Sequence, residues 1–305
     1  DGKIDDTHSL KKKYILTDRV DSKPRTAPAD LPRDMKINDT RNLIDIPAFT
    51  KKVMNKLWKT PYVVNLELAE LVAQNKEAIK ARLGYLDNIE DSGLSFDERE
   101  SFEGINSSID SEIEHLLEAA TYQQAHGNKW YFNWSMSKNG RLFMDSNTLN
   151  PQSGKAIQRF LVLPEKMYRD FDVNNEAHMK YMYFAIAQAF DSVLTDAQIE
   201  QIGKAVVEQD TKAMLNDIVH MDKKAFLKKY ESTGIEGIEN FGHALNVLQH
   251  INKMKEANGK PFKTWLAVEN DSTTSGYSIR FLQFPDPSVV DIFGEKVGII
   301  REDSK

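Results

Sequence analysis

The sequence of 305 residues contains no cysteine, which excludes disulfides, thiolate metal sites and a thiol nucleophile. It also lacks any apolar run near the ~18 residues that a membrane-spanning helix needs, and its first ten residues show no signal-peptide pattern. Neither a G-x-G-x-x-G nor a P-loop pattern occurs, and H-E-x-x-H and G-x-S-x-G are also absent. We therefore expect a protein of a reducing cytoplasm, with no membrane partner.

Acidic charge is concentrated in one segment. The whole chain carries a net charge of −6, but residues 87–118 hold eleven acids against the single arginine Arg99, which gives this segment a net charge of −10 and leaves +4 for the remainder. A mildly basic body of this kind can still bind nucleic acid. The acidic segment is either a solvated surface or a binding surface.

Proline content distinguishes the first part of the chain. We expect residues 1–45 to be an irregular arm, because Ser22–Arg33 holds three prolines and few apolar residues. This arm is either a disordered leader or a segment that packs on a partner. From Ile46 onward the apolar spacing becomes helical, and one face of the first helix should carry Phe49, Val53, Met54 and Leu57.

Periodicity predicts an α+β fold. Helical spacing predicts the helices 47–58, 65–84, 107–127 and 235–257. Alternating and aromatic patterns predict a hairpin over 129–145 that turns at 138–140, and the strands 262–268 and 277–284. Helices therefore come first, followed by a small antiparallel sheet that a large helical insertion over 155–258 interrupts.

Several residues mark the ends of these helices. Gly84 and Gly127 stand where C-terminal caps are expected, and Thr195 with Gln198 forms a capping-box pattern. The histidines His243 and His250 are seven residues apart and can share a helix face. Because no third ligand stands at metal-ligand spacing, the pattern favours two surface or half-buried side chains over a metal pair.

Three segments stand in a specific order. They read "HLLEAATYQQAHGNKWYFNWSMSKNGR" (115–141), "NPQSG" (150–154) and "WLAVENDSTTSGYS" (265–278). Together they resemble the single-subunit RNA polymerases of bacteriophages and mitochondria. Ser137–Arg141 is similar to the Thr/Asp-x-x-Gly-Arg element of that family, and Asp271–Gly276 is similar to its motif A. A fainter similarity, over residues 53–68, is to the Leu-x-x-x-x-Trp-x-(Ile/Val)-Asn helix that precedes the thumb.

The resemblance implies part of a right-hand polymerase fold. It divides the chain into the irregular arm over 1–45, a mainly helical N-terminal and thumb region over 46–127, and a partial palm over 128–305 that contains motif A. The motif Asn150-Pro151-Gln152 would shape the palm. The aromatic residues before the turn would belong to the core rather than to a base-stacking platform; they are Trp130, Tyr131, Phe132 and Trp134.

The resemblance also assigns the catalytic residues. Asp271 would bind two Mg²⁺ ions, and the backbone carbonyl of Ser272 would be a further ligand, because Mg²⁺ prefers hard oxygen donors in two-metal nucleotidyl transfer. Ser275 and Gly276 would leave room for the nucleotide. Relatives that make DNA carry a bulky glutamate at the position of Gly276, so its small size here implies RNA synthesis.

The Gly-Arg turn has two interpretations. In the family-based one, Gly140 lets the backbone approach and Arg141 binds a phosphate of the template–RNA hybrid. In the other, Arg141 is a solvated surface charge.

Two motifs of the family do not occur in this sequence. There is no His-Asp pair (motif C), no Arg-x-x-x-Lys helix followed by Tyr-Gly (motif B), and only 34 residues follow Asp271. The chain thus resembles the N-terminal half of a polymerase, similar to the smaller subunit of the heterodimeric RNA polymerase II of N-four-like phages. This implies a second subunit with the fingers and remaining palm, which would share both Mg²⁺ ions.

The other implied partners are a DNA template, an RNA product and nucleoside triphosphates. The implied location is the cytoplasm of an infected bacterial host. The alternative is a non-catalytic DNA-binding or scaffold protein that derives from a polymerase half.

Overall fold

The computed structural model describes residues 24–33, 35–38, 43–91, 93–136, 142–146, 149–152, 157, 162–190 and 195–268. The chain divides into two units, Asp1–Ala267 and Val268–Lys305, and the described residues belong almost entirely to the first. In the described part of the chain, no helix has both the length and the apolar character needed to cross a lipid bilayer.

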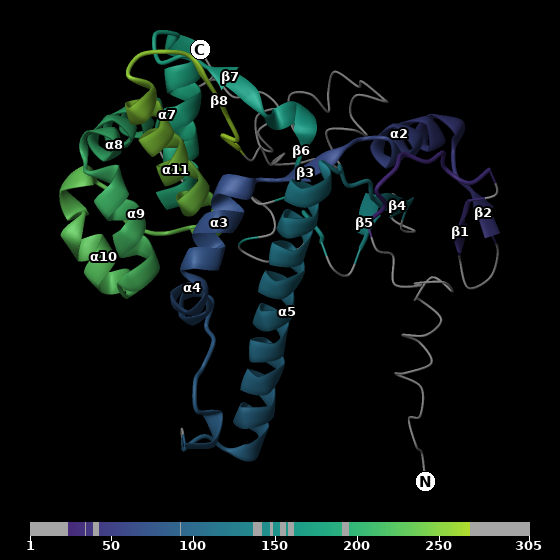
Figure 1. Cartoon of the computed structure of the whole chain (residues 1–305), viewed down its shortest axis with the longest axis horizontal. Helices are drawn as coiled ribbons and strands as arrows, with labels where there is room; N and C mark the ends of the chain where they lie inside the picture. Colours follow the sequence, from purple (N-terminus) through teal and green to yellow (C-terminus); the bar gives the residue numbers. More distant parts are fainter. Residues whose placement is uncertain are drawn as a thin grey trace, which may run out of the picture. The chain divides into compact units, whose positions relative to one another are not determined.

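The described residues form helices and short antiparallel strands, as the predicted α+β class requires (Figure 1). The helices are α2 Ala48–Trp58, α3 Leu66–Gln74, α4 Lys76–Arg82, α5 Phe96–His126, α7 Glu176–Phe190, α8 Asp196–Glu208, α9 Thr211–His220, α10 Lys223–Lys229 and α11 Phe241–Ala257. The strands pair two by two: β1 Lys36–Asn38 with β2 Leu43–Asp45, β3 Tyr62–Val64 with β6 Val162–Pro164, β4 Asn133–Met136 with β5 Leu142–Asp145, and β7 Arg169–Phe171 with β8 Phe262–Thr264.

The longest helix is α5, with 31 residues and therefore about 46 Å of length. Ser95 and Glu98 close a capping box at its start, and Gly127, in the left-handed conformation at φ 65°, ends it as predicted. Near its C-terminal end, the side-chain amide of Gln123 bonds both backbone groups of Val64 in β3: Val64 N–H donates to Oε1 (2.7 Å), and Nε2 donates to Val64 O (2.9 Å). Because Gln123 is buried, this pair of bonds fixes α5 to β3.

Strand β3 joins the segments on either side of the expected boundary at 127/128. Val64 pairs with Val162 of β6, and Tyr62 forms an isolated bridge with Trp130, whose backbone exchanges two hydrogen bonds of 2.8 Å with it. The ring of Tyr62 also meets that of Phe132 edge to face, with centroids 5.0 Å apart. The regions named thumb and palm from the sequence therefore share one packed core here.

The helices α7 to α11 form a second packed region. Helix α7 packs against α8 and α11, and α11 packs in turn against α9. The capping box of Thr195 and Gln198 at the start of α8 is present as predicted. Gly203 of α8 lies directly against the ring of Tyr183 on α7, where a Cβ atom would stand 2.3 Å from the ring, so only glycine permits this close approach.

The structure corrects several predicted bounds. The helix expected over 65–84 divides at Asn75, and α11 begins at Phe241 with Asn240 as its cap. The described part of the insertion, which was expected to be helical from 155, contains β6, a 3-10 turn at Glu165–Met167 and β7 before α7 begins at Glu176. The strand expected over 262–268 ends at Thr264. A strand of three residues is too short to show an alternating pattern in the sequence. The pairing partners of β6 and β7 are also distant along the chain.

The predicted apolar face of α2 is wrong in one position. Phe49 is 77% exposed, whereas Met54 and Trp58 are buried. Residues 49 and 54 are separated by five helical steps, and thus by about 140° around the axis. Because α2 turns Met54 and Trp58 toward the core, Phe49 faces away from it.

Candidate functional site

The predicted site residues lie outside the described part of the chain. They are Gly140, Arg141, Asp271, Ser272, Ser275 and Gly276. The structure does describe the segments that lead to them: Phe262–Val268 ahead of Asp271, and strands β4 and β5 on either side of residues 137–141.

The segment that precedes Asp271 is hydrogen-bonded to helix α11. After β8 ends at Thr264, the backbone of Ala267 is held on both sides: its N–H donates to Asn246 Oδ1 (3.4 Å), and its carbonyl accepts from His243 Nε2 (2.9 Å). The third contact is between His250 Nδ1 and Thr264 Oγ1 (2.8 Å). The three α11 side chains stand at i, i+3 and i+7, and therefore on one face of the helix. We call them the α11 clamp.

All three clamp side chains are buried, with exposed fractions of 1% for His243, 3% for Asn246 and 2% for His250. The prediction of surface or half-buried histidines is therefore wrong. Because a carbonyl oxygen only accepts, the Nε2 of His243 must carry its proton. Burial, with a smaller contribution from Lys253, lowers the pKa of His250 to about 3, so its ring is neutral at pH 7.

The sequence does contain a signal for this clamp. From Gly242 to Leu248 every residue of α11 is buried, so the helix has no solvent face there on which polar residues would normally stand. A polar side chain in such a helix needs a hydrogen-bond partner. The partner of His250 is Thr264 at the end of β8, and the partner of His243 and Asn246 is Ala267 just after it. This need for partners, rather than metal-ligand spacing, identifies the three side chains.

The clamp holds the last part of the described segment that precedes the predicted motif A. Ala267, whose N–H and carbonyl are both bonded, is 4% exposed and stands four positions before Asp271 in the sequence.

The approach to Arg141 is a β-hairpin, as predicted. Strands β4 and β5 pair antiparallel from Asn133 opposite Asp145 to Met136 opposite Leu142, and residues 137–141 connect them. The indole N–H of Trp58 donates to the carbonyl of Trp134 (3.0 Å), which ties β4 to α2. The aromatic residues predicted as core are buried: Trp130, Phe132 and Trp134, while Tyr131 is half-buried.

The Asn-Pro-Gln motif supports the outer edge of this hairpin. Gln152 Oε1 accepts from the N–H of Met144 (2.7 Å), and its Nε2 donates to the carbonyl of Leu142 (3.3 Å). These two backbone groups belong to residues i and i+2, and thus point to the same side of the strand. Gln152 therefore takes the place of a neighbouring strand, and Asn150 Oδ1 in turn accepts from its N–H (3.0 Å). This geometry agrees with the predicted structural role.

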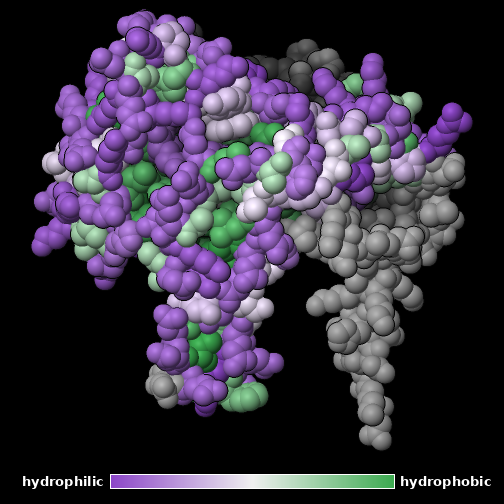
Figure 2. All heavy atoms as spheres, in the orientation of Figure 1, coloured by the Kyte–Doolittle hydropathy of each residue, from purple (hydrophilic) through white to green (hydrophobic). Residues whose placement is uncertain are grey.

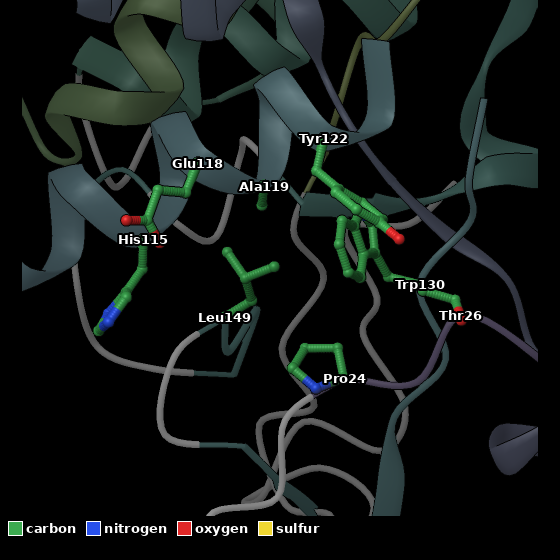
Figure 3. A pocket seen from close by; sticks show the side chains of 8 residues that line it. All are labelled: Pro24, Thr26, His115, Glu118, Ala119, Tyr122, Trp130 and Leu149. Atoms are coloured by element: carbon green, nitrogen blue, oxygen red, sulfur yellow. The ribbon is translucent and has the colours of Figure 1, made fainter. Parts of the chain in front are cut away.

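A cavity of about 480 Å³ lies beside the C-terminal part of α5. Its lining consists of Pro24, Thr26, His115, Glu118, Ala119, Tyr122, Trp130 and Leu149 (Figure 3). In Figure 3 the rings of Tyr122 and Trp130 lie next to each other, and their centroids are 5.7 Å apart. Among the described residues that line it, most are apolar, one is the acid Glu118, and none is a lysine or arginine. It can therefore accept a flat apolar group, but it is not suited to a phosphate.

The other end of α5 is acidic. A second hollow, of about 530 Å³, opens there beside Glu103, Asp110 and Glu114, and of these acids Asp110 is paired with Lys80. Hydrophilic side chains cover most of this end of α5 (Figure 2). This acidic surface repels phosphates, so it is not suited to bind a nucleic-acid backbone. Among the described residues, no three histidine, aspartate or glutamate side chains gather to hold a metal ion.

Comparison with known protein families relates one part of the chain to polymerases. Residues 50–161 match the family model of a virion DNA-directed RNA polymerase domain. The matched region begins within α2, includes the β4–β5 hairpin and ends just before β6. No curated protein matches the chain. The match includes the predicted Gly-Arg turn and supports a phage-type RNA polymerase family and a DNA-directed RNA polymerase role for this chain.

Proposed function

We propose that this chain is one subunit of a split DNA-directed RNA polymerase of an N-four-like type, acting in the cytoplasm of an infected bacterial host. It would contribute the thumb region and the motif A half of the palm. The observation that carries the proposal is the match of residues 50–161 to a virion DNA-directed RNA polymerase domain. Downstream of this region the sequence has a segment that resembles motif A, in the order that the polymerase family uses.

The donor set of the proposed site suits Mg²⁺. The carboxylate of Asp271 and the backbone carbonyl of Ser272 are hard oxygen donors of the kind that Mg²⁺ prefers. When bound, two such ions would activate the RNA 3′-hydroxyl and stabilise the charge on the triphosphate. The α11 clamp would hold the segment that precedes motif A in the sequence. Ser275 and Gly276 would leave room for the nucleotide and for its 2′-hydroxyl.

The hairpin would bind the nucleic acid. Gln152 holds the edge of β5 at Leu142, directly after Arg141, so the guanidinium of Arg141 would start from a fixed strand end. A charge-assisted bond from this guanidinium to a backbone phosphate of the template–RNA hybrid would position the duplex without reading its sequence. A second subunit would supply the groups of motifs B and C, together with the fingers.

The test is reconstitution with the candidate partner, a protein that carries Arg-x-x-x-Lys…Tyr-Gly and His-Asp. We expect template-directed RNA synthesis from nucleoside triphosphates and Mg²⁺ only when both chains are present. Asp271→Asn should reduce the rate by roughly 100-fold or more, comparable with the removal of one electrostatic stabiliser in other active sites. The matched control is Asp87→Asn, an exposed acid outside the site.

A second candidate function follows from the extent of the match, which ends before Asp271. A non-catalytic DNA-binding or scaffold protein derived from a polymerase half would retain the α2-to-hairpin region and no catalytic carboxylate. In that case the partner would bind the chain, but Asp271→Asn would leave RNA synthesis unchanged. That result would refute the catalytic role of Asp271.

A further inference from the structure

Two hollows follow one another along helix α5. The apolar cavity of about 480 Å³ and the acidic hollow of about 530 Å³ share one lining residue, His115. Five of the α5 residues that line them recur at intervals of four or seven positions and therefore share one face of the helix: Glu103, Ser107, Glu114, Glu118 and Tyr122. From Glu103 to Tyr122 this face is about 28 Å long, because each helical residue adds 1.5 Å. We call it the α5 groove.

The two ends of the α5 groove differ in chemistry. The acids Glu103, Glu114 and Glu118 are exposed, and among the described residues none of them has a basic partner. At the other end the ring of Tyr122 is 43% exposed; its centroid is 4.3 Å from that of His126 and 5.7 Å from that of Trp130. One end therefore offers negative charge, and the other offers aromatic surface (Figure 3).

The aromatic end also contains a buried donor that lacks an acceptor. Trp130 lines the cavity and is 9% exposed, and its indole N–H has no hydrogen-bond partner in the part of the chain that the structure describes. Buried donors are normally hydrogen-bonded. A polypeptide carries backbone carbonyl acceptors, whereas a purely apolar ligand carries none. The unpaired donor, the aromatic rings and the unpaired acids together fit a polypeptide segment better than a small apolar molecule.

We propose that the α5 groove binds an extended basic segment of a partner polypeptide. An aromatic side chain of this segment lies in the cavity beside Tyr122 and Trp130, and its arginine or lysine side chains pair with the exposed acids of α5. The charges are complementary, because residues 87–118 carry a net charge of −10. An extended chain advances ~3.3 Å per residue, so eight or nine residues cover the length of the groove.

This inference gives the acidic segment a binding role, with a protein rather than a nucleic acid as its partner. It does not depend on the proposed function, because neither Asp271 nor the Gly-Arg turn takes part in it. Catalysis and binding in the α5 groove can therefore each fail without the other.

The test measures binding of a labelled peptide to the full chain by fluorescence anisotropy. The peptide has one phenylalanine followed by six residues that alternate between glycine and arginine. In one comparison peptide glycine replaces the phenylalanine, and in a second one citrulline, a neutral analogue, replaces each arginine. We expect the original peptide to bind most tightly, and its affinity to fall as the salt concentration rises, because salt screens exposed charges.

Two variants separate the two ends of the groove. Glu114→Gln/Glu118→Gln should weaken binding of the peptide by about 2- to 30-fold, the range for the loss of two exposed ion pairs, and should reduce its salt dependence. Tyr122→Ala removes the aromatic contact and should weaken binding by about 2- to 10-fold without changing the salt dependence. Tyr122→Phe keeps the ring and should bind as the wild type does. Circular dichroism checks that each variant is folded.

The matched control is Glu208→Gln/Glu236→Gln, which removes two exposed acids outside α5 and changes the net charge equally. Losses confined to the α5 variants, with the original peptide preferred over both comparison peptides, support the proposal. An equal loss in the control, equal binding of the three peptides, or unchanged affinity in the α5 variants overturns it. Self-association of the chain that Glu114→Gln/Glu118→Gln abolishes, measured by sedimentation velocity, would assign the groove to a second copy and also overturn it.

Discussion

Acidification from pH 7 to pH 5 should cost this fold about 2 kcal/mol at one side chain, His250 of α11. The ring is 2% exposed and lies against two aromatic rings, edge-on to Phe171 (4.4 Å between centroids) and tilted against Phe262 (5.4 Å). Its Nδ1 bonds to Thr264, whereas its Nε2 has no hydrogen-bond partner among the described residues. Burial, with Lys253 as a lesser cause, lowers the pKa of His250 to about 3.

The sign of the effect follows from proton counting. In the unfolded chain a histidine has a pKa of about 6.5, so between pH 6.5 and about 3 the unfolded state binds a proton that the folded state does not. The stability that depends on the neutral ring is present above pH 6.5 and is lost as the pH falls through this window. Each pH unit below 6.5 costs about 1.4 kcal/mol, which gives about 2 kcal/mol at pH 5.

The assay is urea unfolding of the full chain at pH 7 and pH 5. His250→Gln should lower the free energy of unfolding at pH 7, because packing is lost, but its decrease from pH 7 to pH 5 should be about 2 kcal/mol smaller than in the wild type. His220→Gln, which removes an exposed histidine of α9, is the control and should keep the wild-type pH dependence. An equal pH dependence in His250→Gln and the wild type would refute the reasoning.

Two further predictions concern the glutamine side chains that hold strand edges. Gln123→Ala leaves the buried N–H and carbonyl of Val64 without partners and should lower the free energy of unfolding by about 2–4 kcal/mol, measured by urea unfolding; a loss below 1 kcal/mol would mean that water replaces the amide. Gln152→Ala removes two bonds at the more exposed edge of β5 and should lower the free energy of unfolding by only about 1 kcal/mol. It should also weaken binding of the template–RNA hybrid through residue 141. A loss of stability without any change in hybrid binding would contradict this second expectation.

Features fixed by neighbouring residues could be predicted from the sequence. The capping box at Thr195 and the end of α5 at Gly127 depend on backbone groups only a few residues away, and both are found where they were predicted. The hairpin of β4 and β5 is also a local feature, since its strands are joined by residues 137–141. In each case the residues that decide the structure are adjacent in the sequence.

Features fixed by distant residues were missed. Val64 of β3 pairs with Val162, and Phe171 of β7 pairs with Phe262, so the short strands β6 and β7 exist only through partners about 90–100 residues away. The strand expected over 262–268 stops after Thr264, and the backbone groups of Ala267 bond to α11 side chains instead of a neighbouring strand. Local β propensity could not reveal this competition.

The short strands explain why several polar side chains bond to backbone groups. A strand of three or four residues has few ladder bonds, so its remaining N–H and carbonyl groups must find partners elsewhere. Gln123, Gln152 and the α11 clamp supply those partners, and two of these three supports stand directly before Asp271 or after Arg141. Asp271→Asn leaves the side chains of Gln123, Gln152 and the α11 clamp chemically unchanged. Loss of RNA synthesis in Asp271→Asn, with the unfolding free energy unchanged, would therefore point to the carboxylate rather than to its support.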